Sequence, residues 1–353
     1  MVWQDRLVTS FVAPRTLGAE SVTHRTDIGG GGQVMDGLPV IGVEAFDPGY
    51  GAAYQVDAES LYAQACEVVE DGGSLECRTP AVGTASFEEL AFVDGVRRVD
   101  ARLTATAGGR VCAGIAGAHG VGAVLATPET PVRIERLAVM RLLLWGDGQR
   151  YALPGVGGWA WRPESAPGSG SDASLRDLER RMRVAEGQLA EALCGDGWLT
   201  VVDGPLNNIR SRNMPVIGYV KTHHRPVLDA EQWRRVPRLR VGQRTSLFAL
   251  YSDVHACYTR VGDCGRWASP WAGVVRLDVP SSVGVKAVAQ TVDRAAVWLP
   301  RFASAPHRDP RAPVNLQPVG ALERRLHREL GSRQLAVRAV RDSVRLLTAG
   351  THR

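Results

Sequence analysis

Trp198-Leu199-Thr200-Val201-Val202-Asp203-Gly204-Pro205 ends a run of apolar and β-branched residues with a carboxylate. Such a run predicts a buried β-strand. Gly204 and Pro205 predict a turn after it, because glycine tolerates unusual dihedral angles and proline cannot donate a hydrogen bond to a sheet. Asp203 is therefore expected at the rim of a sheet.

A second copy of this arrangement lies upstream, where Leu90-Ala91-Phe92-Val93 runs into Asp94-Gly95. Two aspartates at strand ends suggest a metal site, although Asp-Gly is also one of the commonest turn pairs. The next strand pattern, Arg97–Thr104, begins after so short a gap that the two strands should form an antiparallel hairpin. Asp94 is then expected near the hairpin tip.

The stretch Ser174–Leu193 predicts a helix, with Gly195 as its stop. At ~100° per residue, Glu186 falls on the edge of the apolar stripe and can reach the rim of a sheet, with Glu179 a close second, whereas Glu191 faces solvent. Both Glu186 and Glu179 therefore stay open as the acid that the helix contributes. The apolar stripe consists of Leu175, Leu178, Met182, Ala185, Leu189 and Leu193.

The predicted elements follow one another as a strand ending in Asp94, two antiparallel strands, a helix bearing Glu186 and a strand ending in Asp203. This is the order of a ribonuclease H-like core, a mixed α/β sheet flanked by helices, in which the acids of these three elements converge. Crowded carboxylates repel one another unless cations hold them. Two divalent ions ~4 Å apart can activate water and stabilise the departing oxygen of a phosphodiester. Mg²⁺ and Mn²⁺ prefer oxygen ligands, so either would suit such a site.

Composition narrows the class of protein. The chain has 353 residues, of which 44% are hydrophobic and 22% charged, and its six cysteines form no Cys-x-x-Cys pair. Structural zinc and a disulfide framework are therefore not expected. No apolar run reaches the ~18 residues that cross a bilayer, and the N-terminus lacks a signal-peptide pattern, which predicts a cytoplasmic protein.

Basic residues concentrate near the C-terminus. The chain carries a net charge of +5, and residues 301–353 contain eleven arginines and no lysine against four acids. Arginine forms bidentate contacts with phosphate, so this segment favours a nucleic-acid partner. A solvated helical surface is the alternative.

Three segments resemble, in order and spacing, successive motifs of the NurA nuclease family, and the resemblance covers residues 88–330. It implies a ribonuclease H-like fold, manganese- or magnesium-dependent cleavage of DNA, a homodimer, and DNA-end processing together with a HerA-type hexameric ATPase. The segments are Phe92-Val93-Asp94-Gly95-Val96, Val201-Val202-Asp203-Gly204-Pro205-Leu206 and Val216-Ile217-Gly218-Tyr219-Val220-Lys221-Thr222.

By this resemblance Asp94 and Asp203 are metal ligands, Glu186 is the acid on the helix and Lys221 holds a phosphate. Family members carry a further histidine, for which this chain offers His307 or His327. They also carry a tyrosine, and the candidates for it are Tyr251 and Tyr219.

We therefore expect a nuclease domain over residues 86–353, with an N-terminal extension, residues 1–85, packed on it. Asp94, Glu186 and Asp203 are expected to bind two Mn²⁺ or Mg²⁺ ions, with His307 joining the site. A non-catalytic, DNA-binding adaptor of the same fold that partners an ATPase is the alternative. The residues expected to hold the DNA backbone are Lys221, Arg225, Arg308 and Arg311.

Overall fold

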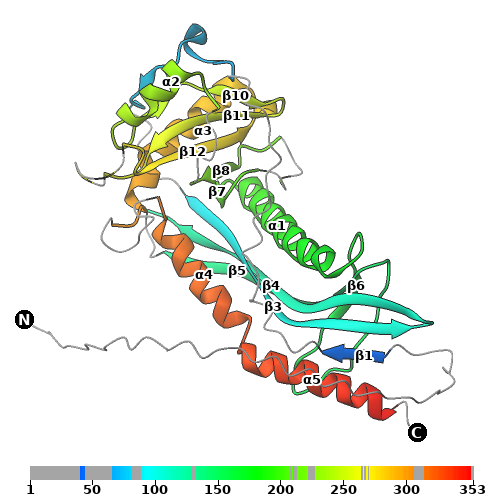
Figure 1. Cartoon of the computed structure of the whole chain (residues 1–353). Helices are drawn as coiled ribbons and strands as arrows, with labels where there is room; N and C mark the ends of the chain where they lie inside the picture. Colours follow the sequence, from blue (N-terminus) through cyan, green and yellow to red (C-terminus); the bar gives the residue numbers. More distant parts are fainter. Residues whose placement is uncertain are drawn as a thin grey trace, which may run out of the picture. The chain divides into compact units, whose positions relative to one another are not determined.

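A mixed β-sheet with helices on both faces forms the frame of the fold (Figure 1). The computed structural model describes residues 40–43, 66–81, 89–128, 132–206, 209, 213–221, 227–263, 265, 268, 270–305 and 314–350, and all of them belong to the unit Gly37–Arg353. In these ranges, twelve strands are hydrogen-bonded into one sheet.

The centre of the sheet has the strand order β5-β4-β3-β7-β8. β3, β4 and β5 are antiparallel neighbours, helix α1 follows, β7 pairs parallel to β3, and β8 pairs parallel to β7. This topology confirms the predicted ribonuclease H-like α/β fold. The elements are β3 (Leu90–Ala107), β4 (Arg110–Ala126), β5 (Arg133–Trp145), α1 (Ser171–Gly195), β7 (Leu199–Asp203) and β8 (Ile217–Val220).

The predicted turn at Asp94-Gly95 is wrong. β3 runs unbroken through these residues, and β4 pairs with it from Leu90 to Ala107. The hairpin instead turns at Gly108 and Gly109, whose φ angles of 55° and 73° suit a tight two-residue turn. Asp94 therefore lies inside a long strand, where its position is set on both sides by neighbouring strands.

Helices cover both faces of this central sheet (Figure 1). Successive residues of a strand point to opposite faces. A Cβ placed on Gly117 of β4 would meet Leu178 of α1, whereas one on Gly122 would meet Leu322 of α4 (Gln317–Glu329). The predicted helix Ser174–Leu193 is confirmed by α1. The two helices thus approach Asp94 from opposite sides of β3.

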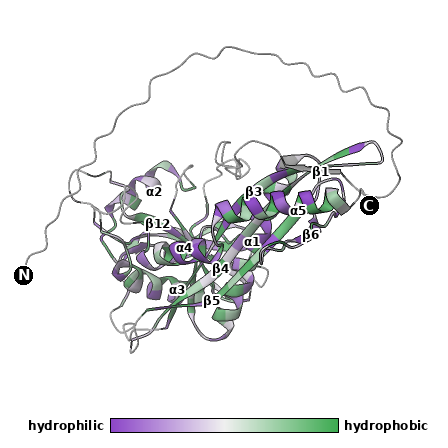
Figure 2. Ribbon diagram, turned by 90° about the horizontal axis from the view of Figure 1, so that it is seen from below, coloured by the Kyte–Doolittle hydropathy of each residue, from purple (hydrophilic) through white to green (hydrophobic). Residues whose placement is uncertain are grey.

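α4 and the last helix, α5 (Arg333–Gly350), are amphipathic. Figure 2 shows hydrophilic and hydrophobic residues alternating along both, whereas β5 is largely hydrophobic. Leu322 and Leu326 of α4 and Val340 of α5 are fully buried. No helix in the ranges that the structure describes is long and apolar enough to span a membrane.

A second group of strands extends the sheet beyond β8 in the order β12-β11-β9-β2. It is covered by α3, whose Val288, Val292 and Ala295 are fully buried. At the other end β6 extends the sheet from β5, while β1 pairs with β3 and β10 with β11. The bounds are β1 (Val40–Val43), β2 (Cys77–Arg78), β6 (Arg162–Ser165), α2 (Ala230–Arg235), β9 (Arg244–Thr245), β10 (Phe248–Tyr251), β11 (Val254–Arg260), β12 (Val274–Pro280) and α3 (Val285–Trp298).

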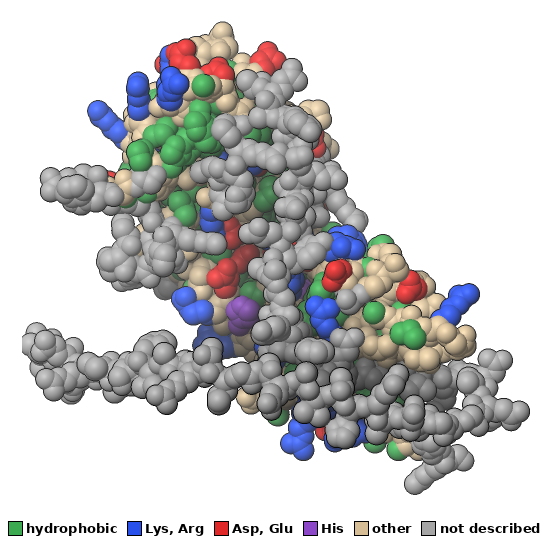
Figure 3. All heavy atoms as spheres, viewed as in Figure 1, with side chains coloured by type: hydrophobic (Ala, Val, Ile, Leu, Met, Phe, Trp, Pro, Cys, Tyr) green, Lys and Arg blue, Asp and Glu red, His purple; other side chains and the backbone are tan. Residues whose placement is uncertain are grey.

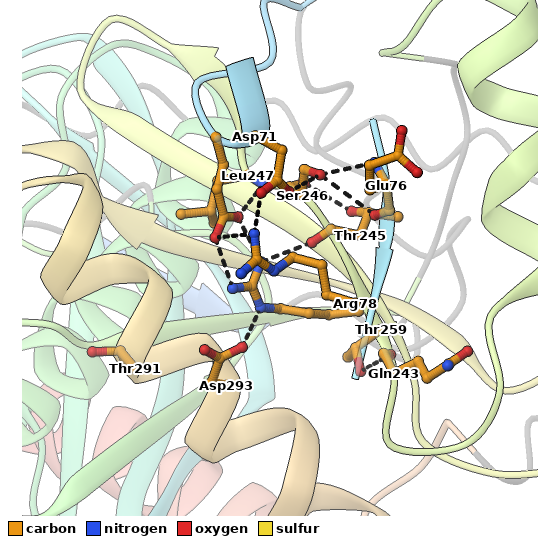
Figure 4. Close-up of polar contacts among 12 residues, drawn as sticks. Asp71, Glu76, Arg78, Gln243, Thr245, Ser246, Leu247, Thr259, Thr291 and Asp293 are labelled. Carbon is orange, nitrogen blue, oxygen red and sulfur yellow. Dashed lines mark hydrogen bonds and ion pairs between the residues drawn. The ribbon is translucent and has the colours of Figure 1, made fainter. Parts of the chain in front are cut away.

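A buried arginine joins this second group of strands to the segment before β2. The side chain of Arg244 is 0% exposed, and its guanidinium donates to both carboxylate oxygens of Glu70, at 2.7 and 3.1 Å, and to Asp293 of α3 at 2.6 Å. The amide of Leu247 also donates to Glu70, and Ser246 donates to Asp71 (Figure 4). Residues 66–81 are thereby fixed to β9 and α3.

Candidate metal centre

Asp94 and Asp203 come from neighbouring parallel strands. β3 and β7 pair in register from Leu90 with Leu199 to Val93 with Val202, and the next residue of each strand is an aspartate. Parallel strands in register bring equivalent residues side by side, so the two carboxylates meet at one place in the sheet. Asp94 is 4% exposed, and Asp203 is partly buried.

A third carboxylate reaches this pair from α4. Asp94, Asp203 and Glu323 each offer one oxygen, and these oxygens all lie within 4.8 Å of one another. Three oxygen ligands from two strands and a helix suit a hard divalent cation. These three acids could therefore hold a metal ion.

Glu323 was missed by the sequence analysis, although a signal for it exists. It follows Val319 by four residues and precedes Leu326 by three, and both of those residues are buried. Residues at these spacings lie on the same face of a helix. Glu323 is exposed at the edge of the apolar face of its helix, and the same position at the edge of an apolar stripe singles out Glu186 on α1.

Glu186 approaches Asp94 from α1. A Cβ on Gly95, the residue after Asp94, would lie 2.5 Å from Glu186 Oε1, so this carboxylate rests against the backbone of β3. Glu179, the other helix acid considered, instead pairs with Arg97 at 3.4 Å. The helix acid beside the two aspartates is therefore Glu186.

Burial and mutual repulsion make these acids weak. Burial raises the pKa of Asp94 to about 8, and the charges of Asp203 and Glu186 add to the effect. Burial also raises the pKa of Glu186 to about 7, although Arg183 opposes the rise. Asp94 Oδ2 and Glu186 Oε1 are buried with no hydrogen-bond partner among the described residues. Buried acceptors without a donor are costly, and a cation would satisfy them.

Two cationic side chains border the acids. Lys221, the residue directly after β8, donates to Asp203 Oδ2 at 2.8 Å. Arg183 of α1 donates to Glu186 Oε2 at 3.0 Å and to the main-chain oxygen of Asp203 at 3.3 Å, which ties α1 to β7. Burial works to lower the pKa of Arg183, but the three acids Glu186, Asp94 and Asp203 outweigh it and raise that pKa.

The remaining predicted residues lie elsewhere or outside the described part. His327 is exposed on α4, one turn after Glu323. The hydroxyl of the buried Tyr219 donates to the main-chain oxygen of Val314, so it is committed to the protein interior. Tyr251 is exposed at the end of β10. The predicted residues that lie outside the described ranges are His307, Arg225, Arg308 and Arg311.

No family model matches the chain, and no curated protein matches it either. Among solved structures, it is similar to the crystal structure of the NurA nuclease from Sulfolobus solfataricus, with a TM-score of 0.38 and 13% sequence identity over 79% of this chain and 87% of that chain. A similarity of this degree assigns no activity. The geometry of the acidic residues is what bears on function.

Proposed function

We propose that the chain is a Mn²⁺- or Mg²⁺-dependent nuclease that hydrolyses phosphodiester bonds of DNA. The observation that carries the proposal is the meeting of Asp94, Asp203 and Glu323 within 4.8 Å at the centre of a ribonuclease H-like sheet. Glu186, beside Asp94, provides a fourth carboxylate, which is enough acid for two cations. Bound divalent ions would supply an activated water and stabilise the leaving oxygen of the phosphodiester.

The cationic neighbours have complementary roles in this proposal. Arg183 holds the Glu186 carboxylate toward the site through its Oε2, which leaves Oε1 directed at the backbone of Gly95. Lys221 neutralises Asp203 in the protein alone and contacts a substrate phosphate when DNA is bound. A lysine ammonium suits the second role because it carries three hydrogen-bond donors and a compact charge.

The outer surfaces of α4 and α5 are proposed to hold the DNA backbone. Figure 3 shows acidic, basic and histidine side chains side by side over α4. On this helix Arg324 directly follows Glu323. Contacts between arginines and phosphates position a nucleic acid without reading its sequence. The exposed arginines of these helices are Arg324, Arg325, Arg328, Arg333, Arg338, Arg341 and Arg345.

The motif resemblance adds two proposals about assembly, namely that the chain forms a homodimer and that it acts with a HerA-type ATPase in DNA-end processing. Sedimentation of the purified chain tests the first. Co-purification with such an ATPase tests the second. Neither result alters the prediction for the isolated catalytic centre.

The decisive experiment is cleavage of labelled duplex and single-stranded DNA by Asp203→Asn in the presence of Mn²⁺. We expect cleavage to be lost and the melting temperature to change little, because Asp203 is partly exposed. Asp196→Asn is the matched control, since Asp196 is an exposed aspartate that pairs with Arg136. If the wild-type chain shifts DNA on a gel but cuts none under any divalent metal, the adaptor function replaces the nuclease.

A further inference from the structure

Four arginines surround two buried carboxylates where α1 meets β6, outside the acidic centre. Arg162 Nε forms an ion pair with Glu164 Oε1 at 2.7 Å, and Arg150 Nη2 donates to Glu164 Oε2 at 2.8 Å. Arg181 Nε donates to Asp177 Oδ2 at 2.7 Å, and Arg180 Nε to Asp177 Oδ1 at 2.9 Å. We call these four arginines the α1–β6 arginine cluster.

The acids of this cluster are buried, and three of its four arginines face water, whereas the side chain of Arg181 is 26% exposed. Glu164 and Asp177 are 7% and 2% exposed, whereas the side chains of Arg150, Arg162 and Arg180 are 61%, 68% and 51% exposed. Two carboxylates cannot neutralise four guanidinium groups, so the surface keeps two positive charges in excess. Each carboxylate also holds its arginines in a fixed orientation, which lowers the entropy lost when they bind an anion.

A row of side chains on α1 connects the acidic centre to this cluster. Residues three apart are neighbours on a helix surface, about 5–6 Å from each other. From Glu186, steps of three residues pass through Arg183 and Arg180 to Asp177, and because each step turns about 60° around the helix axis, this row winds half a turn around α1. Over α1, Figure 3 shows basic side chains next to acidic ones. The row therefore begins at the acids, advances about 13–14 Å along the helix axis and ends at the cluster on the other side of α1.

We propose that the α1–β6 arginine cluster binds the phosphodiester backbone of the DNA strand that enters the acidic centre, several nucleotides from the bond that is cut. This inference rests on the proposed nuclease function and extends it to a substrate contact on α1, separate from the arginines of α4 and α5. The excess charge fits a polyanion, the fixed guanidinium groups fit phosphate oxygens, and Arg183 and Arg180 connect the cluster to the acidic centre around α1.

The test is the salt dependence of binding to a fluorescein-labelled single-stranded oligonucleotide in EDTA, where no metal-dependent cleavage occurs. The variant is Arg162→Ala/Arg180→Ala, which leaves Arg150 on Glu164 and Arg181 on Asp177, so that neither buried acid loses all its partners. We expect a higher Kd, and a slope of log Kd against log salt that falls by about 1.4, since each phosphate contact on a single strand contributes about 0.7.

The matched control is Arg234→Ala/Arg238→Ala, which removes two exposed arginines from α2 and the turn that follows it. An unchanged slope in the Arg162/Arg180 variant, or an equal loss of slope in the control variant, overturns the proposal.

If the Arg162/Arg180 variant unfolds, modification of the arginines of the wild-type chain by phenylglyoxal tests the proposal instead. Protection of Arg162 and Arg180 by the oligonucleotide supports the contact, and equal labelling with and without DNA refutes it. Because binding is measured without metal, failure of the nuclease function appears separately, as retained cleavage by Asp203→Asn.

Discussion

Gly95 lies directly against the carboxylate of Glu186. A Cβ on Gly95 would come within 2.5 Å of Glu186 Oε1, 3.0 Å of Met182 Cγ and 3.1 Å of the main-chain oxygen of Gly120. The glycine after Asp94 therefore does not make a turn. Its missing side chain lets α1 bring the buried carboxylate of Glu186 up to the backbone of β3, one residue after Asp94.

Gly95→Ala should displace Glu186 while the chain still folds. The nearest atom belongs to the mobile end of a side chain, so we expect an overpacking cost of about 1–3 kcal/mol in the free energy of unfolding. Removing Glu186 from its place should weaken Mn²⁺ binding by at least about tenfold, the lower end of the effect seen for residues that only support metal ligands. Calorimetric titration with Mn²⁺ measures this loss.

Gly120→Ala is the control, because its Cβ would meet nothing closer than Leu326 Cδ2 at 3.4 Å. Equal Mn²⁺ affinity in the Gly95 and Gly120 variants would show that the position of Glu186 does not matter to the metal.

Glu323→Gln should reduce Mn²⁺ affinity and DNA cleavage together, by about tenfold to a hundredfold or more. Glu323 is exposed on α4, so the free energy of unfolding without metal should hardly change. Glu329→Gln on the same helix is the control, since Glu329 pairs with Arg325 on the surface. If both variants bind Mn²⁺ as the wild type does, the acid on α4 is not a ligand.

The strand patterns around Asp94 and Asp203 were enough to predict the central fold. The two apolar runs, each ended by an aspartate, pair as parallel strands, and their observed register aligns the two acids. The sequence analysis misplaced the hairpin turn because the pair Asp94-Gly95 is as compatible with a turn as with a strand. In the structure, the glycine makes room in the strand for the carboxylate of Glu186. Only the packing of α1 on β3 distinguishes the strand from the turn.

Glu323 shows the limit of reasoning from local patterns. Its place at the edge of the apolar face of α4 can be counted from Val319 and Leu326. Whether it reaches Asp94 depends on where α4 crosses the sheet, which is set by contacts such as Leu322 over Gly122 that no single segment contains.

Arg244→Met should destabilise the fold strongly. Arg244 is fully buried, and its removal leaves Asp293 without its guanidinium partner and leaves Glu70 paired only with the partly exposed Arg78. Breaking one side of a buried ion pair costs about 3–5 kcal/mol, because it strands the remaining charge. Urea denaturation monitored by tryptophan fluorescence measures the loss.

The triple variant Glu70→Gln/Arg244→Met/Asp293→Asn removes the stranded charges and should recover part of that stability. A triple variant less stable than Arg244→Met would show that the arginine contributes by packing rather than by charge.

The stability of the metal-free chain should fall as the pH rises. Folding raises the pKa of Asp94 from 3.8 to about 8 and that of Glu186 from 4.5 to about 7, chiefly through burial. Between the unfolded and folded pKa values, the folded state binds more protons than the unfolded state, so the free energy of unfolding falls as the pH rises. The contribution of the two acids to this free energy is fully present below their unfolded pKa values and is lost as the pH rises through their folded pKa values. Melting in EDTA should therefore give a lower Tm at about pH 8.5 than at about pH 5.5, and Asp94→Asn/Glu186→Gln should make the Tm depend less on pH.

Mn²⁺ should raise the Tm more at the higher pH, because fewer protons must leave when the metal binds. An equal dependence of Tm on pH in the wild type and the double variant would mean that these two carboxyls do not titrate in this range.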